Sequence, residues 1–247
     1  MAGKTVARLF VAAQLREGAN VTLTRDQSHY LGNVLRLAAG DDVLLFNGAD
    51  GEWQATLKLQ SKKVMQAVCE ALTRPQSWPA PITYAFAPLK HARLDYIAQK
   101  ASELGVARVT PVITEHTISR KLNMDRLRSN LIEGSEQCGV LWVPNIEPAV
   151  ALDTFLRQLR GDETLVFCDE AAESNTPLDA LSSIGPGPVT VLIGPEGGFS
   201  LGEQARIRAH SAAVPISLGP RIMRADTAAV AALALVQSVL GDWRPAV

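Results

Sequence analysis

The strongest constraint on the fold is the alternation of apolar runs and helical patterns from residue 82 onward. Runs such as VTVLI (residues 189–193) and VPISL (residues 214–218) are separated by segments with helical spacing, for example LDYIAQKASELGV (residues 94–106). Strands buried on both faces are apolar throughout, and parallel strands need helical crossovers between them. Residues 82–247 therefore predict an α/β domain whose parallel sheet is covered by helices on both faces.

Residues 5–72 show a different pattern, in which short β-type segments are punctuated by Asn-Gly and Asp-Gly turns. One helical patch, SHYLGNVLRL, interrupts these segments. The pattern predicts a small β-barrel domain over residues 1–73. The proline-rich stretch RPQSWPAPI predicts a linker at residues 74–81, followed by the α/β domain of residues 82–247.

Composition is that of a globular protein with a sizeable core, since 47% of the residues are hydrophobic. No stretch reaches the roughly 18 apolar residues of a membrane span, and the first residues lack the pattern of a signal peptide. We therefore expect a cytoplasmic protein that does not enter a membrane. The three cysteines have no paired spacing, so neither a disulfide nor a metal site is expected, and Cys138 is interpreted as structural.

The net charge of −1 hides an uneven distribution along the chain. Residues 1–130 carry 17 Lys and Arg against 11 Asp and Glu, whereas residues 131–247 carry 7 against 14. A basic first half permits a surface that binds an anionic polymer such as RNA. A solvated surface without a partner is the alternative on charge alone.

The stretch VLIGPEGGFS (residues 191–200) places a glycine-rich turn at the end of a predicted strand. Ser200 and Glu203 have capping-box spacing, so the next helix is predicted to begin at Ser200. The turn lacks both the lysine of a phosphate loop and the glycine spacing of a dinucleotide fingerprint. Gly197 and Gly198 would instead let the backbone approach a flat, uncharged group such as an adenosine. A tight turn without a ligand remains the alternative.

A second Gly-Pro turn occurs in LGPRIMRADTAAVAAL (residues 218–233). Two such turns at the ends of neighbouring strands predict two walls of one pocket at the carboxyl edge of the sheet. Asp226 or Thr227 is the predicted N-cap of the helix that follows. Arg221 and Arg224 precede this helix and are either ligand-binding charges or solvated flanking charges.

The final helix pattern, AAVAALALVQSVLG, is apolar on nearly all sides. A helix of this kind is either a core helix or one half of an oligomer interface.

Together, LIGPEGGFS and LGPRIMRADTAA resemble the paired signature of the RsmE methyltransferases, which belong to the SPOUT class. HYLGNVLRLAAGDDVLLFNGADGEW is similar to the PUA-like barrel of that family, and QKASELGV, TPVITEHT and EGSEQCG resemble its central block. The resemblance implies methylation of N3 of a uridine in the 16S ribosomal RNA of the small ribosomal subunit, with S-adenosyl-L-methionine as the cofactor. It also implies a deep trefoil knot in the C-terminal strands and loops, and a homodimer formed through this knotted domain.

The resemblance further implies roles for individual positions. The loops of the knot correspond to the segment after LVFCDE, to residues 194–199 and to residues 218–227. The implied cofactor-binding residues are Ile193, Gly194, Pro195, Glu196, Gly197, Gly198, Leu218, Gly219, Ile222, Met223, Thr227 and Ala228. Arg221 and Arg224 are the candidates for a charge that favours the uracil anion, and Glu196 is a candidate base or positioning group. The residues expected to bind RNA phosphates are Arg8, Arg36, Lys90, Arg93 and Lys100.

The chain departs from the family pattern in its central block. Lys90-His91-Ala92 replaces a Lys-Gly-Asp type of sequence, Val140 stands where an arginine often occurs, and His116 stands where arginine is common. These departures concern the substrate more than the cofactor.

Two alternative functions fit the same motifs less well. A ribose 2′-O methyltransferase of the same class would transfer the methyl group to a sugar oxygen. A non-catalytic ribosome assembly factor would keep the fold without binding the cofactor. A Rossmann oxidoreductase is disfavoured because the chain has no dinucleotide fingerprint.

Overall fold

A computed structural model describes residues 6–61, 64–119, 121–169, 172 and 176–243. The chain forms two compact units. Unit 1 comprises Met1–Trp78 and Ser135–Val143, and unit 2 comprises Pro79–Gly134 and Pro144–Val247. Residues 135–143 thus group with unit 1, although the sequence pattern assigned them to the second domain.

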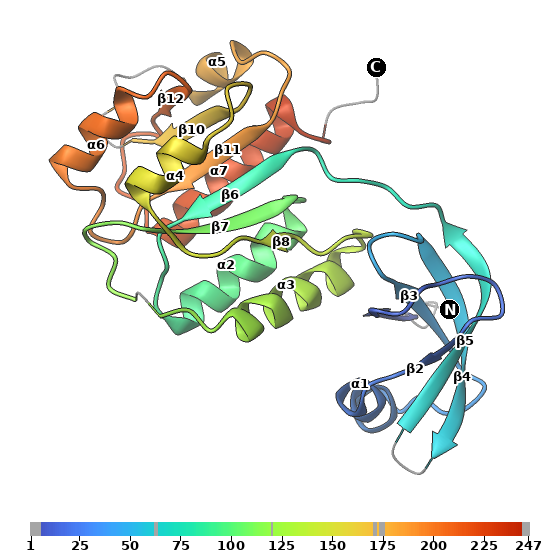
Figure 1. The fold of residues 1–247 in the computed structure, drawn as a ribbon. Coiled ribbons are helices and arrows are strands. Elements are labelled where there is room, and N and C mark those ends of the chain that lie inside the picture. Colours follow the sequence, from blue (N-terminus) through green and yellow to red (C-terminus); the bar gives the residue numbers. More distant parts are fainter. Residues whose placement is uncertain (1–5, 62–63, 120, 170–171, 173–175, 244–247) are drawn as a thin grey trace. The chain divides into compact units, whose positions relative to one another are not determined.

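Unit 1 contains one five-stranded sheet in the order β1-β3-β4-β5-β2 (Figure 1). Its elements are β1 (Ala7–Phe10), β2 (Asn20–Thr22), α1 (Arg25–His29), the π-helical turn η1 (Tyr30–Val34), β3 (Asp42–Phe46), β4 (Glu52–Ser61) and β5 (Val64–Arg74). β1 pairs with β3 in parallel, and the other pairs are antiparallel. The predicted β-segments and the helical patch are confirmed, while closure into a barrel stays a prediction.

The core of unit 1 follows the alternation of its strands. Leu9, Val43, Leu45, Leu57 and Ala67 are all buried in one cluster. Their neighbours in sequence point away from this cluster because successive side chains of a strand face opposite sides of the sheet.

A cluster of two arginines around Glu52 lies in unit 1. Arg8 and Arg74 both form ion pairs with the buried Glu52 carboxylate. Arg8 also donates to the backbone carbonyls of Ser135 and Val140, and its side chain is 10% exposed. Burial alone would raise the pKa of Glu52, but hydrogen bonds from Arg74 and Arg8 outweigh it and hold this pKa below its ordinary value.

The prediction that Arg8 binds RNA phosphate stays a prediction, and the contacts of Arg8 within unit 1 do not favour it. Its guanidinium is occupied by a carboxylate and by carbonyl oxygens within unit 1. Breaking these contacts would leave a buried carboxylate without one of its partners, which is costly. Arg36, by contrast, is exposed, and its φ of 58° places it in the left-handed region.

Unit 2 contains a parallel sheet in the order β12-β10-β11-β6-β7-β8, with β9 beside β7 (Figure 1). Its strands are β6 (Ile82–Phe86), β7 (Arg108–Ile113), β8 (Asn145–Ile146), β9 (Val150–Ala151), β10 (Thr164–Cys168), β11 (Val189–Ile193) and β12 (Ala213–Ile216). Its helices are α2 (His91–Glu103), α4 (Leu152–Gln158), α5 (Pro177–Ser182), α6 (Leu201–Arg208) and α7 (Ala225–Leu240), and α3 (Met124–Cys138) ends within unit 1. Every described pairing in this sheet is parallel, which confirms the predicted α/β class.

Helices flank the sheet of unit 2. Phe155 of α4 and Ile207 of α6 pack with Leu165, Phe167 and Leu192 of the strands. α7 packs against α2, α5 and β11, and Figure 1 shows α4 and α7 on opposite sides of the strands. The sheet is therefore covered on both faces, as its apolar strands predict.

The end of α2 was predicted correctly from the sequence, but the start of α7 was not. α2 ends before Gly105, whose φ is 69°, as the glycine stop predicted. α7 begins at Ala225 with Arg224 as its N-cap, and no side chain caps it. The prediction of Asp226 or Thr227 as the N-cap is wrong, because both residues already lie in the first turn.

α7 is anchored to α2 through a polar contact in the core. Gln237 is fully buried and donates to the carbonyl of Leu104 at 2.6 Å. Among the residues that the structure describes, no helix is both long and apolar enough to cross a membrane.

Candidate functional site

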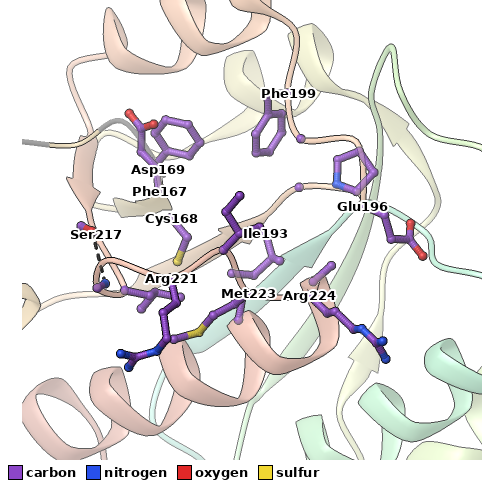
Figure 2. A pocket seen from close by; sticks show the side chains of 18 of the residues that line it. Phe167, Cys168, Asp169, Ile193, Glu196, Phe199, Ser217, Arg221, Met223 and Arg224 are labelled. Carbon is purple, nitrogen blue, oxygen red and sulfur yellow. Dashed lines mark hydrogen bonds between the residues drawn. The ribbon is translucent and has the colours of Figure 1, made fainter.

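A pocket of about 600 Å³ lies at the carboxyl ends of β10, β11 and β12 (Figure 2). The residues that line it come from the ends of these three strands, from the loops after them, from the starts of α2 and α7, and from α6. Ligand sites of α/β proteins commonly occupy this edge of the sheet. We call this cavity the main pocket.

The two Gly-Pro turns form two walls of the main pocket, as predicted, but their strands are not adjacent. β10 lies between β11 and β12 in the sheet. The end of β10, from Phe167 to Asp169, therefore lines the pocket between the two walls. Sequence order does not reveal which parallel strands are neighbours, and this explains the error.

The first wall, residues 194–200, has a tightly determined backbone. The Gly198 N–H donates to the Pro195 carbonyl at 2.9 Å, and Gly198 has a φ of 66°, which favours glycine. A Cβ on Gly194 would lie 2.8 Å from the Phe199 ring. Ser200 and Glu203 form the predicted capping box, so α6 begins where the sequence indicated.

The segment after β7 braces the first wall. His116 Nδ1 lies 3.0 Å from the carbonyl oxygens of both Gly197 and Gly198. Since carbonyls only accept, Nδ1 must carry the proton. The Glu203 carboxylate, 1% exposed, accepts from the backbone N–H groups of Ser200 and Glu115. The contacts of His116, and that of Glu203 with Glu115, were not predicted from the sequence. The one feature that could have indicated them is His116, which stands where arginine is common in the family.

Arg93, from the start of α2, links the first wall to the start of α7. Its guanidinium lies 3.1 Å from Glu196 Oε1 and 4.0 Å from Asp226 Oδ2. Glu196, the candidate base, is thus the partner of an ion pair. Arg93, expected to bind RNA, lines the main pocket.

The end of β10 forms an ordered floor. Phe167 and Phe199 make an edge-to-face contact with their ring centroids 5.4 Å apart. Asp169 is buried and pairs with Arg208 at 2.6 Å. Burial, with a smaller contribution from Asp169, raises the pKa of the Cys168 thiol to about 12. This thiol therefore stays neutral and does not behave as a nucleophile.

The second wall, residues 217–224, has fewer contacts. Arg221 and Arg224 are exposed, and neither forms an ion pair with a described residue. Ile222 is 88% exposed. Figure 2 shows both guanidinium groups on the opposite side of the view from Phe199. Two positive charges are therefore available at the rim of the pocket.

Comparison with known proteins identifies the family. Residues 76–237 match the family described as "RNA methyltransferase domain", and residues 23–66 match "RNA methyltransferase PUA domain". The ribosomal RNA small subunit methyltransferase E of Rickettsia conorii is 33% identical over 93% of this chain and 94% of the relative. The enzyme of the same name from Synechocystis is 32% identical over 94% of this chain and 78% of the relative. The chain belongs to the ribosomal RNA small subunit methyltransferase E family.

Solved structures of similar proteins support this assignment. A putative methyltransferase of Legionella pneumophila in complex with S-adenosylmethionine has a TM-score of 0.88 and 31% identity, covering 97% of this chain and all of that one. The methyltransferase E of Neisseria gonorrhoeae, bound to S-adenosylmethionine, has a TM-score of 0.85 and 28% identity with the same coverage.

The residues that the family resemblance marked for cofactor binding mostly line the main pocket. The exceptions are Gly197, which faces His116, and Thr227, in the first turn of α7. Phe199, Pro220 and Ala225 also line the pocket and lie in the predicted loops, although they were not among the individual candidates. The sequence missed the other lining residues: Phe167, Cys168, Asp169, Gln204 and Ser217. Cofactor contact by any of these residues stays a prediction.

The remaining candidates for RNA binding in unit 2 are Lys90 and Lys100. Lys90 is exposed and is the N-cap residue of α2. Lys100 pairs with Glu103, and this hydrogen bond raises the pKa of Lys100. Most of the segment after LVFCDE lies outside the described residues. The described part of the chain contains no cluster of His, Cys, Asp and Glu suited to a metal ion.

Proposed function

We propose that this protein transfers a methyl group from S-adenosyl-L-methionine to N3 of a specific uridine in the 16S ribosomal RNA of the small ribosomal subunit. The observation that carries the proposal is the pocket in which the two family motifs meet at the carboxyl edge of the sheet. The relatives named as methyltransferase E, and similar structures bound to the same cofactor, support it.

The residues of the main pocket fit S-adenosylmethionine. A volume of about 600 Å³ suits a ligand of this size, and typical small-molecule sites range from roughly 300 to 1,000 Å³. Ile193, Leu218 and Met223 line the pocket and provide apolar surface for an adenosine. The glycine-rich wall carries Glu196 and no lysine, which suits a ligand without phosphate. When bound, the cofactor supplies an electrophilic methyl group.

Arg221 and Arg224 supply the chemistry that the acceptor needs. N3 of uridine is a weakly acidic imide and must lose its proton to become nucleophilic. A guanidinium beside the uracil carbonyls favours the anion, because an adjacent positive charge lowers the pKa of an acid. Glu196 is held by Arg93, so we assign it a positioning role in preference to that of a base.

The finer features of the family belong to the same proposal. The C-terminal loops would be threaded as a trefoil knot, as the family resemblance implies. A homodimer would form through unit 2, where Val230, Leu235 and Val239 of α7 are only half-buried. Residues 1–73 would form the PUA-like domain that binds RNA, with Arg36 among its contacts.

Nucleoside analysis of small-subunit RNA from cells that lack this protein tests the proposed function. We expect 3-methyluridine to disappear from 16S RNA and to return when the wild-type gene is restored. An unchanged 3-methyluridine content would contradict the proposal. Loss of a 2′-O-methylated nucleoside instead would indicate the ribose methyltransferase.

A further inference from the structure

A second hollow adjoins the main pocket in unit 2. It measures about 450 Å³ and is lined by Lys90, Ala92, Arg93, Ile118 and Glu196. Arg93 and Glu196 also line the main pocket, so their ion pair stands between the two spaces. A group bound in the hollow would therefore lie next to whatever occupies the main pocket.

We propose that this hollow is the acceptor subsite, which receives a pyrimidine nucleotide from a single-stranded segment of RNA. The inference rests on the proposed function, because only a methyl acceptor must lie beside the cofactor. It goes further by naming the residues that hold the nucleotide and the part of the nucleotide that each one contacts.

Lys90 is the phosphate-binding group of the subsite. Its side chain is exposed and forms no ion pair with a described residue. It is the N-cap residue of the 13-residue α2, where the helix dipole also favours an anion. The phosphate flanking the acceptor nucleotide would neutralise this charge, whereas an uncharged ligand would leave it without a role.

Ile118 is the surface on which the base lies. Its side chain is 68% exposed, and with Ala92 it gives the hollow an apolar side. Apolar side chains contact the faces of unstacked bases, which is how single-stranded RNA is commonly held. Burying this isoleucine beneath a base would remove its apolar surface from water.

Arg93 is the positioning residue for the polar edge of the base. Ion pairs with Glu196 at 3.1 Å and with Asp226 at 4.0 Å restrain its guanidinium. The carbonyl oxygens of uracil flank N3 and accept hydrogen bonds, while Arg only donates. Because Arg93 belongs to both spaces, a base that bonds to it presents N3 on the side of the main pocket.

Two substitutions separate the roles of Lys90 and Ile118: Lys90→Ala and Ile118→Gln. The matched controls are Arg157→Ala on α4 and Leu178→Gln on α5, which change exposed residues that line neither space. The probe is small ribosomal subunits purified from cells that lack the protein. Methyl transfer to these subunits, their binding as a function of salt, and binding of S-adenosylhomocysteine are measured for each variant.

We expect Lys90→Ala to reduce the slope of log affinity against log salt by about 1, which is the signature of one lost phosphate contact. Ile118→Gln should leave that slope unchanged and lower kcat/KM for the subunits about tenfold, as expected when one apolar contact with the base is lost. Both variants and both controls should bind S-adenosylhomocysteine with wild-type affinity, because the cofactor pocket is intact.

The outcomes distinguish this inference from the proposed function. Wild-type protein that methylates the subunits, together with variants that behave as the controls do, would overturn the acceptor subsite alone. Wild-type protein without methyl transfer would overturn both. A change in oligomeric state on Ile118→Gln, measured by light scattering, would assign the hollow to an interface between copies of the chain and would also overturn the subsite.

Discussion

The loops after β11 and β12 both line the main pocket, but they are held in different ways. In the first wall, residues 194–200, the backbone is fixed by an internal turn, by His116 and by the buried Glu203. In the second wall, residues 217–224, the described contacts are few, such as the 3.3 Å bond from the Gly219 N–H to Ser217 Oγ. The conformation of the first wall is therefore fixed by hydrogen bonds, whereas the second wall carries arginine side chains that form no ion pair with a described residue.

From this difference we expect the first wall to bind the cofactor and the second wall to act in catalysis. A wall that is already ordered loses little entropy when a ligand binds, so it can recognise a flat adenosine through its backbone. Arg221 and Arg224 on the other wall have no acidic partner among the described residues, and their charge is therefore available to an acceptor. Substitutions in the first wall should affect stability and cofactor affinity, whereas substitutions in the second should affect catalysis.

Arg221→Ala tests the second wall and should have the largest effect. We expect kcat to fall roughly 100-fold, as when one preorganised charge donor is removed from an active site. The melting temperature and the affinity for S-adenosylmethionine should stay close to wild type, because the side chain is exposed. Steady-state kinetics and calorimetry measure these quantities. Full activity would remove Arg221 from the mechanism.

Glu203→Ala tests the first wall through its brace. The substitution leaves the N–H groups of Ser200 and Glu115 without their acceptor, so we expect a loss of about 2 to 4 kcal/mol in unfolding free energy. Urea denaturation measures this loss. Glu203→Gln retains one acceptor oxygen and should lose about half as much. Equal losses for both variants would show that the carboxylate charge, and not the pair of bonds, is what matters.

Gly194→Ala and Gly219→Ala compare the two walls directly. A Cβ on Gly194 would displace the Phe199 ring, which should cost about 1 to 3 kcal/mol and weaken cofactor binding. Gly219 has a φ of 105° and open space around it, so alanine there should add only backbone strain of about 1 kcal/mol. Thermal unfolding and cofactor titration should rank Gly194→Ala as the more damaging change. The reverse order would contradict the contrast between the walls.

Alkylation of cysteines tests the end of β10, which lies between the two walls, and it is the prediction with the smallest expected effect. Because its pKa is about 12, the Cys168 thiol is protonated at pH 8, and its reactivity should appear only as the pH rises toward that value. Cys138 is exposed and serves as the internal control. Mass spectrometry after iodoacetamide treatment at pH 8 should find Cys138 modified and Cys168 intact. Equal labelling would contradict the raised pKa of Cys168.

Features that depend on a few neighbouring residues were predicted well. The capping box of Ser200 and Glu203, the end of α2 before Gly105 and the strands of unit 1 all follow from local spacing and turn residues. The parallel sheet followed from apolar runs that only a sheet covered on both faces can bury. The two motif loops were likewise expected to share a pocket, and they do.

Features that depend on distant partners were missed. Arg8 looked like a free basic residue, yet it bonds to the carbonyl of Ser135, 127 positions away. The sequence could not show that β10 separates β11 from β12, nor that His116 reaches the carbonyls of Gly197 and Gly198. Topology rules that disfavour knots could not have indicated the threading that the family resemblance implies.

By itself, the sequence determined the class of sheet, the start of α6, the end of α2 and the motif loops that form the pocket. These features depend on side-chain spacing and backbone freedom over a few neighbouring residues, so they do not require contacts with distant parts of the chain. The tertiary structure alone decided which strands are neighbours and which arginines form ion pairs with buried carboxylates. It also decided that the first wall, residues 194–200, is held by hydrogen bonds from His116 and to Glu203. These outcomes depend on residues brought together across long stretches of chain, where burial and the pairing of charges select the partners.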